Sequence, residues 1–126
     1  MKRVWIASVI LLSVLVLTIF HSVHLTGFTD ELTSLLEQAE THAEVGNWER
    51  AQQYNDLAHR LWEEKDAYLH VLLRHSDTDA IYTSFHEVEE FLQCQEGGEY
   101  SAANAKLIVQ LELLSEAEQL TLKNIL

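Results

Sequence analysis

An uncharged apolar run near the start of the chain constrains its structure more than any other feature. The seventeen residues from Val4 to Phe20 contain no charged side chain, and two basic residues, Lys2 and Arg3, precede them. As a helix the run spans roughly 25 Å, and continuation to Leu25 brings it to roughly 33 Å, enough to cross the hydrocarbon core of a bilayer. The run therefore predicts a membrane-spanning helix, and a buried helix of a soluble core is the weaker interpretation.

A cleaved signal peptide is the main alternative, because it also has a basic start and an apolar middle. Its cleavage requires small residues at the first and third positions before the cut. The candidate sites each pair a small residue with a large one: Ser22 with Phe20, Thr26 with His24, and Gly27 with Leu25. Since no cysteine lies near the end of the run, a lipid-modified cleavage site is excluded. We therefore expect residues 1–25 to form an uncleaved anchor.

The distribution of charge predicts where the rest of the chain lies. Positive residues beside a membrane helix prefer the cytoplasmic side, and Lys2 and Arg3 are the basic residues nearest the run. From residue 21 onward there are six basic and twenty acidic residues, a net charge of −14 with neutral histidines. This charge argues against nucleic acid as a ligand and against a second contact with anionic lipid headgroups. Residues 26–126 are therefore expected to form an acidic extracytoplasmic domain.

Length and composition favour a single helical domain after the anchor. The chain has 126 residues, no proline and only four glycines, which disfavours turn-rich all-β folds. One cysteine allows neither an internal disulfide nor a multi-thiolate zinc site.

Apolar residues beyond residue 29 recur every three or four positions, the spacing of one face of a helix. Four stripes result: Leu32, Leu35, Leu36, Ala39 and Ala43; then Trp48, Ala51, Tyr54, Ala58, Leu61, Trp62, Leu69 and Leu72; then Ile81, Phe85, Val88 and Leu92; and finally Tyr100, Ala103, Leu107, Leu111 and Leu114. Each stripe gives one helix an apolar face to bury.

Capping residues predict the bounds of the first two helices. Thr29 is expected to cap the first helix, whose first turn then contains two acidic residues. Gly46 suits the left-handed position that ends this helix, and Asn47 can cap the next one. The second helix is expected to end near Arg74 and His75.

The last helices are predicted in the same way. Ser76 begins a capping box for the third helix, which is expected to stop at the glycine pair 97–98. The fourth helix should begin near Glu99. A second Ser-x-x-Glu pattern at Ser115 predicts a short final helix that runs toward Ile125 and folds its apolar tail onto the bundle.

A weak internal repeat indicates that these helices pair as two hairpins. Residues 46–51 (GNWERA) match residues 98–103 (GEYSAA). In each segment an aromatic can fill the wedge between two antiparallel helices, and an alanine allows their backbones to approach. The turn also resembles that of tetratricopeptide hairpins, but the displacement of 52 residues does not fit their 34-residue repeat. The expected fold is all-α, with an N-terminal transmembrane helix, a four-helix bundle of two αα-hairpins and a short C-terminal helix.

Histidine and acidic residues form the best candidate for a metal site. The group is His70, His75, Asp77 and Asp79, with His86 and Glu87 further along. His70 and His75 are five residues apart and so point from different faces of a helix, whereas a spacing of four would let them converge. The favoured interpretation is that His75 and the aspartates stabilise the end of one helix and the start of the next. A low-affinity cation site at this acidic turn is the open alternative, and no residue is assigned as a metal ligand.

Candidate catalytic groups lack the partners that catalysis needs. Cys94 has no glycine-rich turn or helix start to activate its thiol. The acidic pairs Glu63–Glu64 and Glu89–Glu90 are adjacent in sequence, so their side chains point about 100° apart on a helix. No phosphate-binding loop, nucleophile elbow or dinucleotide motif occurs. We therefore expect no enzyme, no catalytic residue and no cofactor.

Aromatic side chains could instead form a protein-binding surface. The candidates are Trp48, Trp62, Tyr68, Tyr82 and Phe91. Trp48 is better explained as part of the hairpin core. Tyr68 and Tyr82, if both are exposed, are the first candidates for a docking surface.

The whole pattern resembles a family of small single-anchor membrane proteins of unknown function from Gram-positive, often spore-forming, bacteria. The resemblance rests on the basic start and anchor, the turn at residues 46–51, the acidic segment after His75, and the terminal residues 120–126 (LTLKNIL). Many relatives are expected to have a proline near Ser115, and its absence here leaves the break before the last helix less defined. The resemblance implies a membrane-tethered helical domain outside the cytoplasm, with no assigned reaction.

Together these observations predict a single-pass membrane protein with a cytoplasmic N-terminus. Its extracytoplasmic helical domain is expected to act as an interaction or accessory module for another membrane or envelope protein. The alternative hypothesis is an extracytoplasmic divalent-cation binder or sensor that uses the turn at His75.

Overall fold

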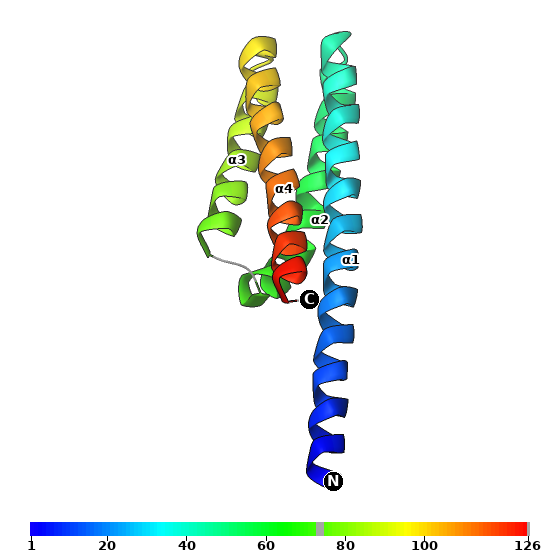
Figure 1. Ribbon diagram of the computed structural model, residues 1–126. Helices are drawn as coiled ribbons and strands as arrows, with labels where there is room; N and C mark the ends of the chain where they lie inside the picture. The colour runs from blue at the N-terminus through cyan, green and yellow to red at the C-terminus, as the bar shows by residue number, and fades with distance from the viewer. Residues whose placement is uncertain (73–74, 126) are drawn as a thin grey trace.

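The computed structural model describes residues 1–72 and 75–125, without the side chains of residues 22, 66–68, 70–72, 75, 118 and 121–125 (Figure 1). The described residues form four helices: α1 (Lys2–Glu44), α2 (Trp48–Leu72), α3 (His75–Gln93) and α4 (Gly97–Ile125). The all-α expectation is therefore confirmed.

The helices form a closed ring in which each one packs against two others. α1 packs against α2 and α4, and α3 packs against the same two helices. Figure 1 shows that the α1–α2 and α3–α4 turns lie together at the end far from the N-terminus. The chain thus folds as two antiparallel hairpins, as the internal repeat predicted, and the N-terminal half of α1 extends alone beyond the bundle.

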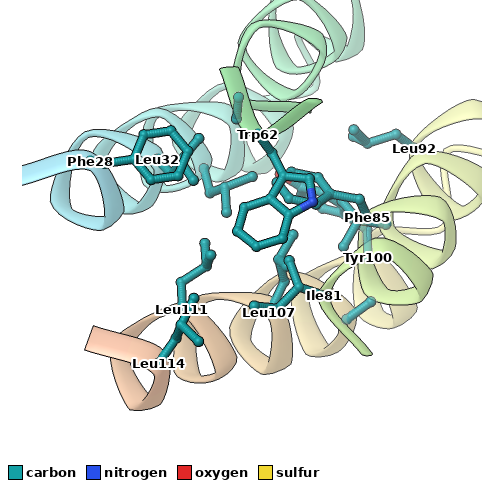
Figure 2. Close-up of a cluster of buried hydrophobic side chains, with 14 of the residues drawn as sticks. Phe28, Leu32, Trp62, Ile81, Phe85, Leu92, Tyr100, Leu107, Leu111 and Leu114 are labelled. Carbon is teal, nitrogen blue, oxygen red and sulfur yellow. The ribbon is translucent and has the colours of Figure 1, made fainter. Parts of the chain in front are cut away.

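Interior positions in every helix are spaced alternately by three and four residues, the pattern of a left-handed bundle. The buried side chains at these positions are Leu25, Thr29, Leu32, Leu36, Ala39 and Ala43 in α1; Ala51, Asn55, Ala58, Trp62 and Leu69 in α2; Thr78, Ile81, Phe85, Val88 and Leu92 in α3; and Tyr100, Asn104, Leu107, Leu111 and Leu114 in α4. Figure 2 shows Trp62 at the centre of this cluster, beside Phe85 and facing the leucines of α4. Every described residue of the predicted stripes is buried or packs against the core except Tyr54, which is partly exposed and stacks on His42.

The expected break between the anchor and the first bundle helix is wrong, because α1 is continuous from Lys2 to Glu44. Thr29 is buried inside the helix, and its hydroxyl donates a hydrogen bond to the Thr26 carbonyl at 3.1 Å. A threonine caps a helix only where the chain enters it from another direction. Here Thr29 occupies an interior position of the bundle. Because apolar residues before and after it, such as Leu25 and Leu32, are also buried, packing stabilises a continuous helix through this position. The predicted boundary after residue 25 falls within α1.

The expected short C-terminal helix is also wrong, because α4 continues through Ser115 to Ile125. Ser115 is buried, and its Oγ lies 3.2 Å from Oγ1 of Thr26 in α1. A polar partner from another helix therefore satisfies this serine, and it does not cap a new helix. Leu120 remains exposed, and the other side chains of the predicted folded-back tail lie outside the described residues.

The turn between α1 and α2 is the one that the sequence predicted. Gly46 has a φ of 80°, and hydrogen bonds run from the Gly46 and Asn47 amides to the carbonyls of Ala43 and His42. This is the Schellman arrangement that ends many helices. Oδ1 of Asn47 then accepts a hydrogen bond from the Arg50 amide at 3.2 Å, so Asn47 caps α2.

The turn between α3 and α4 differs from the predicted one. The left-handed residue is Gln95, with a φ of 55°. The amides of Gln95 and Glu96 donate hydrogen bonds to the carbonyls of Leu92 and Phe91, which is a second Schellman arrangement. The glycine pair 97–98 lies in the first turn of α4, which begins two residues before Glu99. α3 begins at His75, one residue before the predicted cap Ser76.

Candidate functional site

The N-terminal half of α1 is an exposed apolar helix, and its described side-chain hydroxyls are all hydrogen-bonded within the helix. Among the described residues, α1 alone is long and apolar enough to cross a membrane, and its most apolar window is wholly unburied. A signal sequence would have the same features. The three hydroxyls of this segment each donate to a carbonyl four residues earlier, at 2.8 Å: Ser8 to Val4, Ser13 to Val9, and Thr18 to Val14. Internal satisfaction of polar groups is what a lipid environment requires.

The bundle begins almost at once where the apolar run ends. Leu25 is only 2% exposed and belongs to the core, although it follows Phe20 by five residues, or about 7.5 Å of helix. Phe28, one turn further on, stacks on Trp62 with ring centroids 6.3 Å apart. The apolar half of α1 and the bundle are therefore parts of one helix, with no linker between them.

Side chains from both neighbouring helices hold α1 at this junction. From α2, Nζ of Lys65 lies 3.3 Å from Nε2 of His24. From α4, Nε2 of Gln119 donates to Oγ1 of Thr26 at 3.2 Å, the same hydroxyl that meets Ser115. Polar contacts on two sides therefore fix the direction in which the apolar segment leaves the bundle.

The structure does not bring the candidate metal ligands together in its described part. Asp77 and Asp79 are exposed on the first turns of α3, and the side chains of His70 and His75 lie outside the description. His86 packs edge-on against Tyr82, with centroids 4.5 Å apart, and Glu87 pairs with Lys106 at 3.6 Å. Among the described residues, no three His, Cys, Asp or Glu side chains could share an ion.

A histidine that the sequence analysis did not single out, His59, forms a cluster of ring and carboxylate contacts. The His59 ring stacks on Phe85, with centroids 5.0 Å apart, and meets His86 edge-on at 5.6 Å. Its two nitrogens lie 3.3 Å from a Glu63 oxygen and 3.9 Å from a Glu89 oxygen. The cluster joins α2 to α3. In the sequence, this cluster could have been suspected because His59 directly follows Ala58, which occupies an interior position of the bundle.

The remaining candidates from the sequence are dispersed. Cys94 is exposed in the distal turn, with its thiol 3.9 Å from a Glu90 carboxylate oxygen. Trp62 is buried, and Trp48 and Phe91 are partly buried against the core. Tyr82 is half exposed, and the Tyr68 side chain lies outside the description, so the surface predicted from this pair stays a prediction.

A groove between α3 and α4 is a concave surface that the sequence analysis missed. It has a volume of about 450 Å³ and lies toward the end of the bundle where α3 begins and α4 ends. Its lining comprises Ala80, Ile81, Leu113, Leu114, Ala117 and Leu120, with Asp77, Gln110 and Glu116. The lining is mostly apolar, and two of its leucines, Leu113 and Leu120, are 56% and 59% exposed.

The groove continues into an apolar outer face of α4. Ala102, Ala105, Val109, Leu113, Ala117 and Leu120 are all exposed. Their spacing follows the helical period, so they lie on one side of the helix. A helix that is apolar on both its inner and outer faces is typical of one that is covered on both. This spacing was visible in the sequence but was obscured by the buried stripe on the opposite face.

Comparison with known proteins places the chain in a family. Residues 19–125 match the domain of unknown function DUF4363. The chain belongs to this family. The DUF4363 region covers the last residues of the apolar run and the whole bundle, so the junction between them lies inside the family unit. No curated protein and no solved structure matches the chain.

Proposed function

We propose that this DUF4363 protein is a single-pass membrane protein whose helical bundle is an extracytoplasmic interaction or accessory module without enzymatic activity. The observation that supports it is the continuity of α1, which is apolar and exposed over its first half and buried in the bundle core over its second. Exposed apolar surface of this extent is unfavourable in water, and a bilayer is the environment that suits it. The proposed binding partner of the bundle is another membrane or envelope protein.

The continuous helix gives this module a defined orientation as well as a location. A flexible linker would allow the bundle to rotate freely above the membrane. Here the lowest core residue, Leu25, follows the apolar run within two helical turns. A side chain of α2 holds the helix at His24, and side chains of α4 hold it at Thr26. The bundle is thus held at a fixed distance from the membrane surface. It meets its partners by diffusion within the plane of the membrane.

Charge supports the proposed topology. Lys2 and Arg3 flank the apolar run on one side, and the acidic residues all follow it. Basic flanking residues favour retention on the cytoplasmic side. The bundle, with its strong negative charge, is then the translocated part.

The native cysteine allows a direct test of the topology. Cys94 is the only cysteine, is exposed, and lies at the end of the bundle far from the N-terminus. We expect a membrane-impermeant maleimide to label it in intact cells. The matched control is a cysteine in a short extension added before Met1, in a Cys94→Ser background. It leaves Lys2 and Arg3 in place and should react only after lysis. The opposite pattern would place the bundle in the cytoplasm and overturn the proposal.

A second measurement separates an anchor from a cleaved signal. The intact mass of the protein purified from membranes should include the whole apolar run. A mature chain that begins beyond Leu25 and is released by washing would contradict the tether, even if Cys94 were labelled from outside.

A further inference from the structure

We infer that the groove between α3 and α4 is a docking site for a basic amphipathic helix of another membrane-associated protein. This inference rests on the proposed function, which makes the bundle an interaction module, and adds the surface and the chemistry of the partner. The groove floor is formed by Ile81 and Leu114, both almost fully buried, and Leu113 and Leu120 stand exposed along its side. Such a surface excludes water from apolar side chains that are inserted into it.

The dimensions of the groove suit a short helix. Its lining on α4 extends from Gln110 to Leu120, a span of eleven residues and about 15 Å of helix. Leu113 and Leu120 are seven residues apart and therefore project from one face, two turns from each other. Helices that bind in grooves insert apolar residues at positions i, i+3 or i+4, and i+7, which span the same two turns.

The charge around the groove selects a basic partner. The charged side chains in its lining are Asp77 from α3 and Glu116 from α4. They belong to a part of the chain whose net charge from residue 21 onward is −14. A second copy of this chain would bring the same negative charge, and anionic lipids would be repelled in the same way. Lysine or arginine residues beside the apolar anchors of a helix would instead complement this rim.

The position of the groove indicates a partner close to the membrane. The residues that line it are in the first turns of α3 and the last turns of α4, the end of the bundle from which the apolar half of α1 extends (Figure 1). Because α1 continues without a linker, this end faces the membrane. A helix that emerges from the bilayer or lies on its surface can reach the groove without unfolding any part of the bundle.

The test measures binding of a defined peptide to the full-length protein in nanodiscs of zwitterionic lipid. The probe is a labelled helical peptide with leucines on one face and lysines at its flanks, and its binding is followed by fluorescence anisotropy. We expect saturable binding that salt weakens. A peptide with glutamate in place of lysine, and one with the same composition in scrambled order, should not bind.

Two matched variants locate the site. Leu113→Asp should weaken binding about tenfold or more, because it places a charge among the apolar contacts. Leu57→Asp adds the same charge at an exposed leucine of α2 outside the groove, and should leave binding unchanged. Attraction to the acidic surface alone would instead make both variants bind the probe slightly better, and that result would overturn the proposal. Circular dichroism melting of each variant checks that the bundle remains folded.

Two further experiments distinguish a basic helix from a second copy of this chain as the occupant of the groove. The double variant Asp77→Asn, Glu116→Gln should weaken binding and reduce its salt dependence. If the protein instead forms a dimer that Leu113→Asp abolishes and Leu57→Asp does not, the groove belongs to a second copy and the proposal is wrong. Both measurements are independent of membrane topology, so a cytoplasmic bundle would refute the proposed location and leave this binding test intact.

Discussion

Trp48 and Tyr100 meet edge to face at the distal end of the bundle, with ring centroids 6.4 Å apart and ring planes at 75°. Each aromatic occupies the first turns of the helix that follows a Schellman turn, one in each hairpin. The repeat at residues 46–51 and 98–103 thus has one physical cause, since both aromatics fill the same end of one core. Edge-to-face pairs contribute about 0.5–1.5 kcal/mol beyond the area they bury.

Removal of the Tyr100 hydroxyl should change how stability depends on alkaline pH. Burial raises the pKa of the Tyr100 phenol above its ordinary value of 10.0, and the nearby charge of Glu40 raises it further. Above pH 10 the unfolded chain releases this proton and the folded chain retains it. The unfolded state then binds fewer protons, so stability falls as pH rises, by about 1.4 kcal/mol per pH unit from this group.

The measurement compares the full-length protein with its Tyr100→Phe variant by urea unfolding in nonionic detergent. Below pH 10 the variant should be as stable as the parent or more so, because the hydroxyl is buried without a described partner. At pH 11 the variant should be the more stable by an additional margin of about 1.4 kcal/mol. Parallel pH profiles would show that Tyr100 titrates normally in the folded protein.

Substitutions at the left-handed residues of the two Schellman turns should have opposite effects on the free energy of unfolding. Gly46→Ala introduces a side chain at a φ of 80° without any steric neighbour, and should destabilise by about 1 kcal/mol. Gln95→Gly relieves the same backbone cost at a φ of 55° and should stabilise by about 0.5–1 kcal/mol. Urea unfolding of the two variants measures both, and effects of equal sign would contradict the left-handed assignment of Gln95.

Replacement of a buried amide in α2 should stabilise the bundle. Asn55 is 1% exposed, and neither its amide nitrogen nor its oxygen has a described hydrogen-bond partner. Asn55→Leu keeps the side chain similar in size and should add about 1–3 kcal/mol to the free energy of unfolding. The control is Asn104→Leu, which also removes a 3.1 Å hydrogen bond to the Leu36 carbonyl and should be less favourable by about 1 kcal/mol.

The same pair of variants tests whether the buried amides specify the arrangement of the helices. Interior asparagines can fix register in helical assemblies at a cost in stability. Thermal unfolding of Asn55→Leu should then be less cooperative even as the midpoint rises. Destabilisation by more than about 1 kcal/mol would show that the Asn55 amide is hydrogen-bonded in solution.

A substitution at the junction tests the continuity of α1. Gly27 lies inside the helix, is exposed, and has no atom near the position of an added Cβ. Gly27→Ala should therefore stabilise the full-length protein by about 0.5–1 kcal/mol, because alanine loses less backbone entropy in a helix. Helicity by circular dichroism and the urea midpoint measure this effect. A loss of stability would indicate that the chain turns at Gly27, as the predicted cap at Thr29 required.

Much of the fold could be read from local patterns. The spacing of apolar residues identified the apolar core positions from Leu32 onward, but not Leu25 and Phe28 near the junction or buried polar positions such as Asn55. Gly46 with Asn47 identified the first turn. These signals are local because helix periodicity and capping act within one or two turns. The groove could not be predicted in this way, since Ile81 and Leu113 are 32 residues apart and meet only when α3 packs on α4.

Local patterns along the chain are enough to predict an apolar anchor-like segment, an acidic remainder and helices with one buried face each. Whether a residue of capping type begins a helix depends instead on how the helices pack. Thr29 and Ser115 both have the residue type of a helix start, yet each is buried against a partner helix and lies within a continuous one. A cap contributes about 1 kcal/mol at one position, whereas an unbroken helix buries several apolar side chains on either side of it. Packing therefore outweighs the local preference, and it joins the apolar segment to the bundle as one helix.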